Sequence, residues 1–243
     1  KGYEVPESSR QSKGKAIANF LQVSSSDLIT AVIPIPKDKK SSRYLFMATA
    51  NGIIKKVDID AFSNVRSNGL AAIKLKDDDE LRWVLTTSGD DQIILVTSDG
   101  NSIRFKEKDV RPMGRGASGV IGVRMDKGQK LVGADVIPAG VEKGLKLLVV
   151  MENGYGKRTD MRAYKTQSRG GKGIMTAKIT SKTGKLVSAH ITSEENKELI
   201  AVSRKGQVIR TSIASVSVLG RATQGVRVMR LDAGDGLASV VVV

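Results

Sequence analysis

Residues 147–159 read Leu147-Leu148-Val149-Val150-Met151-Glu152-Asn153-Gly154-Tyr155-Gly156-Lys157-Arg158-Thr159. This stretch indicates an apolar strand, a tight turn and a second strand that carries two cations. Asn-Gly between two strand-like runs is a strong signal for a hairpin turn. Apolar runs also precede Asn51-Gly52, Asp99-Gly100 and Gly206, and cationic segments follow them. The stretch therefore predicts a β-hairpin that recurs along the chain.

The recurrence has a period of about fifty residues. One series of turn glycines has intervals of 50, 48, 54 and 52 residues, and a second series has intervals of 55, 50, 54 and 52. Each glycine of the second series follows an arginine by three or four residues. The first series is Gly2, Gly52, Gly100, Gly154 and Gly206; the second, with its arginines, is Arg10/Gly14, Arg66/Gly69, Arg115/Gly119, Arg169/Gly173 and Arg221/Gly225. Four short strands per unit, repeated radially, are typical of a propeller.

We expect an all-β, propeller-like disc of about five visible four-stranded blades, forming a single domain over residues 1–243. The predicted units are approximately 1–49, 50–98, 99–151, 152–203 and 204–243. Further strands are expected at 73–75, 131–137, 174–179, 186–192 and 228–231. No long amphipathic helix is expected; 58–63 and 106–110 could each form a helical turn at most.

The composition points to a polyanionic partner. Lys and Arg number 40 against 25 Asp and Glu, which gives a formal net charge of +15. This charge favours nucleic acid first and an anionic membrane surface second. We find no apolar run of 18 residues and no signal-peptide core, and zero cysteines exclude disulfides and thiolate metal sites. This fits a cytosolic protein, and the start at Lys1 suggests a fragment.

The loop Gln167-Ser168-Arg169-Gly170-Gly171-Lys172-Gly173 contains two cations and three glycines. Glycines let backbone N–H groups approach a ligand closely, and the cations suit a phosphate. Because equivalent positions of a radial repeat fall on one edge, we expect the repeated cations to form a stripe that binds phosphates rather than base edges. The candidate DNA-binding residues are Arg10, Lys13, Lys55, Lys56, Arg66, Arg104, Arg115, Lys157, Arg158, Arg169, Lys172, Arg210 and Arg221.

Other motifs carry no chemistry in our interpretation. Residues 114–119 formally match G-x-G-x-x-G, but no helix pattern follows, so we reject a dinucleotide site. The acidic stretch 77–80 is interpreted as a turn rather than a metal site. His190 is the single histidine and is expected in a strand, so no metal cluster or triad is predicted around it. Tyr155 and Tyr164 could brace the 167–173 loop, and Trp83 is expected in the core.

The 167–173 loop resembles the signature box of the DNA gyrase A C-terminal domain, whose pattern is Gln-Arg-Arg-Gly-Gly-x-Gly. Residues 47–52, 103–106, 153–159 and 220–226 also look like that family, and the resemblance covers nearly the whole chain. It implies a β-pinwheel whose blades exchange a strand with their neighbours and whose basic rim wraps DNA. Ser168 departs from the box, which removes one cation. The family's principal box lies in its first blade, and the domain usually has six, so we expect that first blade to be absent here.

The resemblance implies a non-catalytic module that binds and bends double-stranded DNA, without a cofactor of its own. The holoenzyme, a type IIA topoisomerase, would use ATP and Mg on other domains to introduce negative supercoils. The implied partners are the gyrase B protein and the N-terminal core, in an A2B2 assembly within the bacterial cytoplasm and nucleoid. The isolated domain is expected to be a monomer that does not bind membranes.

Two alternatives stay open. The first is the matching C-terminal domain of topoisomerase IV, which usually has degenerate boxes and does not wrap DNA strongly. The second is a propeller-type scaffold whose basic charge serves an acidic protein partner. A catalytic domain is the weakest class, because no catalytic constellation is visible in the sequence.

Overall fold

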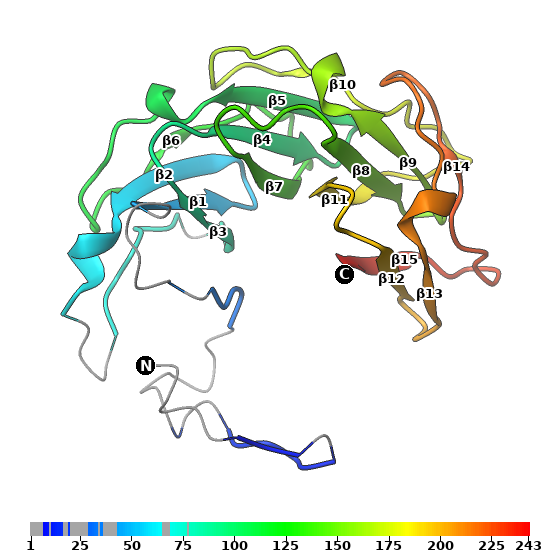
Figure 1. Cartoon of the computed structure of the whole chain (residues 1–243), viewed down its shortest axis with the longest axis horizontal. Coiled ribbons are helices and arrows are strands. Elements are labelled where there is room, and N and C mark those ends of the chain that lie inside the picture. Colours follow the sequence, from blue (N-terminus) through cyan, green and yellow to red (C-terminus); the bar gives the residue numbers. More distant parts are fainter. Residues whose placement is uncertain are drawn as a thin grey trace.

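The chain is seen in a computed structural model that describes residues 7–9, 11–16, 19, 29–33, 35, 43–64, 69–76 and 78–243. Residues 43–243 form an open arc of β-sheets (Figure 1). Four antiparallel sheets follow one another along this arc, and we number them blade 1 to blade 4 in chain order. The predicted first unit, 1–49, falls mostly outside the described residues, and its last six residues belong to the first of the four sheets.

Each blade is built from a hairpin, an inner strand and, in three blades, a short outer strand. Blade 1 has the order β3 (Leu81–Thr87), β1 (Tyr44–Thr49), β2 (Ile53–Asp58), β6 (Val120–Ile121). Blade 2 has β7 (Leu131–Ile137), β4 (Gln92–Thr97), β5 (Asn101–Lys106), β10 (Ile174–Met175). Blade 3 has β11 (Leu186–Thr192), β8 (Lys146–Met151), β9 (Tyr155–Asp160), β14 (Val226–Arg227). Blade 4 has β15 (Leu237–Val242), β12 (Glu198–Ser203), β13 (Val208–Ser212).

The outer strand of a blade comes from the following repeat. β6 pairs with β2 only after the chain has passed through β4 and β5 of blade 2, and β10 and β14 repeat this exchange one blade further on. The side of the arc where β6, β10 and β14 lie is called the outer edge below (Figure 1). The exchange joins each blade to the next by hydrogen bonds, as the pinwheel resemblance implied.

The hairpin turns form where the glycine pattern predicts them. Gly52, Gly100, Gly154 and Gly206 all have φ between 78° and 91°, the left-handed region that glycine tolerates best. Ala48 pairs with Ile54 across the first of these turns, and Val150 pairs with Gly156 across the third. The predicted strands 131–137 and 186–192 are confirmed as β7 and β11.

The core lies between neighbouring blades. Leu147 and Val149 of β8 pack with Ile94 of blade 2, whereas Leu148 and Val150 of the same strand pack toward blade 4. Both faces of the central strands are therefore buried, which explains why they are continuous apolar runs instead of alternating ones. Trp83 is partly buried and packs against the cluster between blades 1 and 2.

Single 3-10 turns follow the second hairpin strand of each blade. They are η3 (Ile59–Phe62), η4 (Glu107–Asp109), η5 (Met161–Ala163) and η6 (Ile213–Ser215). The first two confirm the short helical turns expected at 58–63 and 106–110. Asp58, Asp160 and Ser212 each accept a hydrogen bond from the backbone two residues on, which caps the turn. Among the residues described, no helix is long and apolar enough to cross a bilayer.

Two strand predictions were wrong and a third was too long. Residues 73–75 and 228–231 form no strand, and the strand expected over 174–179 is limited to β10. Their backbones bond to a neighbouring loop instead of a ladder: the N–H of Lys74 donates to Ala117 O over 3.3 Å, and that of Met229 donates to Gly154 O over 3.1 Å. An alternating pattern of apolar and polar residues cannot distinguish a strand in a sheet from a half-buried, extended segment that bonds a neighbouring loop.

Candidate nucleic-acid interface

The arginine loops occupy the outer edge of the arc. We define them as residues 111–125, 165–179 and 218–231; each contains one of the short outer strands. In each loop the second-series glycine, Gly119, Gly173 or Gly225, has positive φ. An added Cβ would meet a backbone carbonyl oxygen of the preceding blade at 2.2–2.5 Å. Glycine is therefore required for the loop to lie on that blade.

Backbone hydrogen bonds link the loops in series. The N–H of Lys74 bonds Ala117 O, that of Arg124 bonds Gly171 O over 2.9 Å, and that of Lys178 bonds Thr223 O over 3.0 Å. The three acceptors occupy the same position of successive repeats, as do the three donors. The outer edge is thus a continuous chain of loops that runs across blades 1 to 3.

The arginines of two loops reach back to the preceding loop. Arg169 Nη1 donates to Ile121 O over 3.1 Å, and Arg221 Nη1 donates to Met175 O over 2.9 Å. Ile121 and Met175 are equivalent residues of β6 and β10, so the contact is repeated from loop to loop. These guanidinium groups bond carbonyls rather than carboxylates, so their positive charge is not neutralised, and both are half-exposed.

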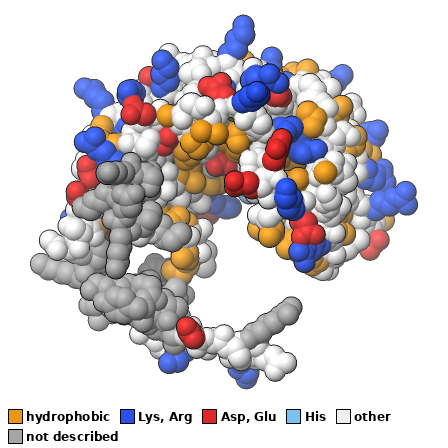
Figure 2. Space-filling view, viewed as in Figure 1, with side chains coloured by type: hydrophobic (Ala, Val, Ile, Leu, Met, Phe, Trp, Pro, Cys, Tyr) orange, Lys and Arg blue, Asp and Glu red, His pale blue; other side chains and the backbone are white. Residues whose placement is uncertain are grey.

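A second series of exposed cations, missed in the sequence, has one member in each of these loops and one in the equivalent stretch 69–76 of the preceding repeat. It comprises the residues five positions after each second-series glycine: Lys74, Arg124, Lys178 and Arg230. Three of them are the backbone donors that link the loops. The repeat spacing could have revealed them, because the cation recurs at one register position in four units. Figure 2 shows Lys and Arg side chains projecting along the outer edge of the arc.

Lys55 and Lys157 were wrongly predicted to face DNA. Both side chains are fully buried beneath the arginine loop of the following blade. Lys55 Nζ donates to Ala72 O over 2.7 Å, to Ala117 O over 2.9 Å and to Arg115 O. Lys157 Nζ donates to Gly220 O over 2.6 Å, to Thr223 Oγ1 over 3.0 Å and to Arg221 O. Each ammonium is saturated by internal acceptors and presents no surface to a phosphate.

Burial lowers the pKa of both lysines. Desolvation brings the pKa of Lys157 from 10.5 to about 8, and the neighbouring Arg221 charge acts in the same direction. The pKa of Lys55 is also lowered by desolvation. The backbone and hydroxyl acceptors offset part of the cost of holding a cation away from water.

Lys56, Arg104 and Arg158 form a second internal series, each tying its blade to the 3-10 turn of the next. Lys56 Nζ lies 3.4 Å from Glu107 Oε1, and Arg158 Nε donates to Val216 O over 2.8 Å. Arg104, which is 3% exposed, donates to Tyr164 O over 2.9 Å and to Met161 O over 3.2 Å. The prediction that Lys56 and Arg104 contact DNA is therefore wrong, because both side chains are buried in these bonds.

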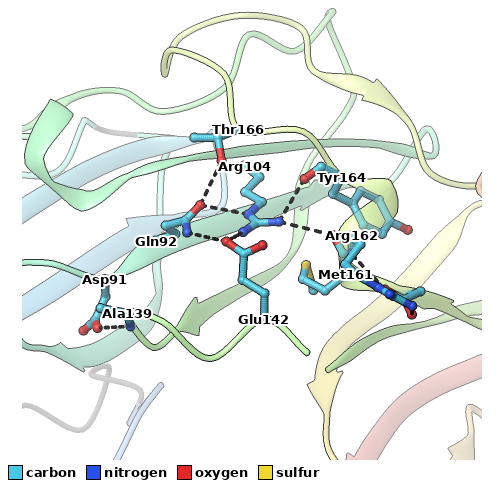
Figure 3. A network of polar contacts seen from close by, with 10 residues as sticks. Asp91, Gln92, Arg104, Ala139, Glu142, Met161, Arg162, Tyr164 and Thr166 are labelled. Carbon is cyan, nitrogen blue, oxygen red and sulfur yellow. Dashed lines mark hydrogen bonds and ion pairs between the residues drawn. The ribbon is translucent and has the colours of Figure 1, made fainter. Parts of the chain in front are cut away.

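Figure 3 shows the polar network around Arg104. Its Nε donates to Gln92 Oε1 over 3.0 Å and its Nη2 pairs with Glu142 Oε1. Gln92 Nε2 donates to the same Glu142 oxygen over 3.0 Å, and Thr166 Oγ1 donates to Gln92 Oε1 over 2.9 Å. The network joins β4, β5 and the start of the 165–179 loop, so Arg104 fixes the base of that loop.

The remaining candidates are dispersed. Arg10 and Arg66 lie outside the described residues, and Lys13 is exposed in the N-terminal segment. Arg210 is exposed on β13 but pairs with Glu198, its Nε lying 2.8 Å from Oε2. Lys172 is exposed and pairs with Asp126 over 3.0 Å. These pairs lie at the surface, where an ion pair is weak and exchanges readily for a phosphate.

Tyr164 supports the 165–179 loop from below. Its hydroxyl lies 2.5 Å from Thr176 Oγ1, and the ring is buried. Burial raises the pKa of Tyr164, with the Thr176 hydrogen bond acting against it. Tyr155 instead contacts β14 of blade 3, where Arg227 Nη2 donates to its hydroxyl over 2.9 Å. His190 lies in β11, as expected, and Asp79 accepts from the N–H groups of Asn51 and Glu80 as a turn residue does.

The blades exchange strands and are arranged in an arc, and linked cationic loops lie on the outer edge. These features define a propeller-type domain that presents positive charge along a curve. A family model described as "DNA gyrase C-terminal domain, beta-propeller" matches residues 1–36, 43–88, 91–138, 146–193 and 197–243. The chain belongs to the DNA gyrase C-terminal domain family. The first matched segment, 1–36, extends the family match into the N-terminal part of the chain.

Curated relatives agree with this assignment. The chain is 43% identical over 241 residues to the DNA gyrase A protein of Staphylococcus epidermidis, and 43% identical over 232 residues to that of Staphylococcus aureus. The first alignment covers 99% of this chain and 26% of the relative, and the second covers 95% and 26%. The chain thus spans about a quarter of the length of the gyrase A proteins it resembles.

Solved structures share the architecture. A DNA gyrase A C-terminal domain superposes with a TM-score of 0.77 at 30% identity, covering 95% of this chain and 75% of the other. The C-terminal domain of DNA topoisomerase IV superposes with a TM-score of 0.85 at 23% identity, covering 95% and 70%. At that identity the second comparison supports the fold alone.

Proposed function

We propose that this domain binds the phosphate backbone of double-stranded DNA along its outer edge and bends the duplex around the arc. The observation that carries the proposal is the hydrogen-bonded series of arginine loops, which places repeated cations on one curved edge. The cations concerned are Lys74, Arg115, Arg124, Arg169, Lys172, Lys178, Arg221 and Arg230. Phosphate contacts of this kind position a duplex without reading its sequence, so preference comes from bendability.

Within the full-length gyrase A protein, the domain would deliver a DNA segment to the strand-passing core of a type IIA topoisomerase. The gyrase B protein would supply ATP hydrolysis in an A2B2 assembly, and negative supercoils would result. This role is supported by the gyrase A relatives, of which the chain represents about a quarter. The same bacterial relatives support action on the nucleoid in the cytoplasm, with the isolated domain acting as a monomer.

A fluorescence-anisotropy salt titration with a duplex of about three helical turns tests DNA binding. If about 8 phosphates are neutralised, log affinity should fall against log salt with a slope near −7. Replacing Arg124, Lys178 and Arg230 together by Gln should weaken binding strongly and make the slope shallower by about 3. The matched control replaces Arg162, Arg204 and Lys205, which are equally exposed but lie away from the arginine loops. Binding that ignores salt, or equal losses in both triple variants, would refute the assignment and favour a protein-interaction scaffold.

The topoisomerase IV domain is the second candidate, favoured by Ser168 in place of the first box arginine. A topology assay on the full-length protein with its ATP-hydrolysing partner separates the two. Supercoiling of relaxed plasmid identifies gyrase, whereas relaxation and decatenation without supercoiling identify topoisomerase IV.

A further inference from the structure

Three arginine loops rest on the same register position of three consecutive blades. The position is the third residue after the hairpin glycine, and it holds Lys55 in β2, Ile103 in β5 and Lys157 in β9. All three side chains are fully buried. The three blades therefore support their loops differently, with a cation under two loops and an aliphatic side chain under the one between them.

The two lysines fix the path of the loop above them. Each ammonium uses its three protons on three acceptors, which are backbone carbonyls in most cases and one threonine hydroxyl. Arg115 O and Arg221 O, at equivalent positions, each accept one of these bonds. The backbone of the arginine itself is thus held from inside the domain.

Ile103 offers the middle loop no donor. The residues above it include Gly170, Gly171 and Gly173, and a Cβ at Gly171 would lie 3.6 Å from Ile103 Cδ1, in ordinary van der Waals contact. Its three glycines give the backbone of this loop a wide choice of conformations. From below, Ile103 offers only van der Waals contact where the neighbouring loops have three polar bonds. The middle loop is tied instead to the preceding loop by two backbone bonds, from Gly170 N–H to Gly122 O over 2.7 Å and from Arg124 N–H to Gly171 O over 2.9 Å.

Two buried polar atoms beside Ile103 lack partners. In the described part of the chain, three buried side-chain atoms have no hydrogen bond, and two of them are Ser102 Oγ and Gln167 Nε2. Ser102 is 1% exposed and pairs with Ile174 at the end of the loop, while the backbone N–H of Gln167 bonds Arg104 O over 2.7 Å at its start. An unpaired buried polar group is costly, so this conformation of the loop is less favourable than one that satisfies both atoms.

We propose that Lys55 and Lys157 are positioning residues that hold two arginine loops in place for DNA, and that Ile103 leaves the 167–173 loop free to change conformation when it meets a phosphate backbone. The proposal rests on the proposed function. Two preorganised loops lose little freedom on binding, and one adaptable loop between them accommodates duplexes of different curvature.

Hydrogen–deuterium exchange of the domain without DNA tests directly whether the buried lysines hold their loops in place. In the wild type, amides of 169–173 should exchange about five- to tenfold faster than those of 115–119 and 221–225, since about one net hydrogen bond of stabilisation is missing. Lys157→Met should raise exchange in 221–225 to the level of 169–173 and leave 115–119 unchanged. Uniform exchange over the three wild-type loops would overturn the proposal even if no variant folds.

A salt titration separates a positioning residue from a direct phosphate contact. Lys157→Met should weaken DNA binding about three- to tenfold with an unchanged salt slope, because the buried ammonium neutralises no phosphate. The matched control is Lys178→Met on the same edge, for which the slope should become shallower by about 0.9. A slope change for Lys157→Met equal to that control would overturn the positioning role.

Ile103→Lys supplies the converse test. The new ammonium should slow exchange in 169–173 and widen the difference in affinity between flexible and stiff duplexes of equal length, because the loop can then adapt less to the curvature of the duplex. The proposal that a buried lysine holds its loop would be contradicted by two results together. These are faster exchange in 169–173 of Ile103→Lys and unchanged exchange in 115–119 of Lys55→Met. If the wild type fails to bind DNA, the exchange results still show whether the lysines hold their loops. The proposal on DNA binding and the proposal on loop positioning can therefore fail independently.

Discussion

The backbone N–H of Arg124 donates to the carbonyl of Gly171 over 2.9 Å, so an exposed cation of one arginine loop is joined to the glycine-rich centre of the next. The bond makes the spacing between successive cations a property of the backbone rather than of flexible side chains. Curvature of the arc then sets the curvature of whatever polyanion follows the edge.

Single substitutions on this edge should each remove about one phosphate contact. For Arg124→Gln, Lys178→Gln and Arg230→Gln we expect a loss of about fivefold in affinity at about 100 mM salt and a slope shallower by about 0.9 in each case. The backbone bonds of these residues are retained, so thermal stability should change little. Arg162→Gln, which removes an exposed cation paired with Asp160, is the control and should leave the salt slope unchanged.

The stability of the domain should depend on pH through Lys157. Its folded pKa of about 8 lies below the unfolded value of about 10.4, so the unfolded chain binds more protons between these values. This group therefore opposes folding at neutral pH and ceases to do so as pH rises from about 8 to about 10.4. Urea unfolding at several pH values should show the wild type gaining stability relative to Lys157→Met across that window. A constant difference between the two proteins would show that the lysine is not desolvated.

Arg104→Met should destabilise the domain by about 3 kcal/mol, because it removes the side-chain donor to the carbonyls of Tyr164 and Met161 and the ion-pair partner of Glu142. Glu142→Gln should cost less than about 1 kcal/mol, since the Glu142 side chain is 42% exposed. Chemical denaturation measures both. Equal effects would mean that the ion pair, rather than the carbonyl bonds, makes the arginine necessary.

Gly173→Ala should cost roughly 1–3 kcal/mol from backbone strain alone, and more from the collision. The residue has φ of +75°, and the new Cβ would meet Ser102 O at 2.2 Å. Gly114→Ala is a suitable control, because it lies in another arginine loop with nothing within 4 Å of an added Cβ. A shift in thermal midpoint restricted to Gly173→Ala is the expected result.

The repeat period predicted the blades because each hairpin glycine and each loop glycine has a backbone requirement that only glycine meets easily. The positions of the cations could be predicted less well. Lys55 and Lys157 repeat at the same spacing as surface cations, and period alone cannot show which side of a strand faces the next blade. One signal was present in the sequence: Ile103 and Ile209 occupy the register of these lysines. A position that alternates between lysine and isoleucine is one where the aliphatic stem must be buried.

The strand exchange also determines how the arc withstands mechanical load. Bending roughly 20–30 base pairs through about 40–90° costs about 1–6 kcal/mol, and a duplex held on the outer edge exerts a matching force that tends to straighten its support. In blades 1 to 3 that force acts across strands borrowed from the neighbouring repeat, so opening the arc requires breaking backbone pairing between repeats as well as separating apolar faces.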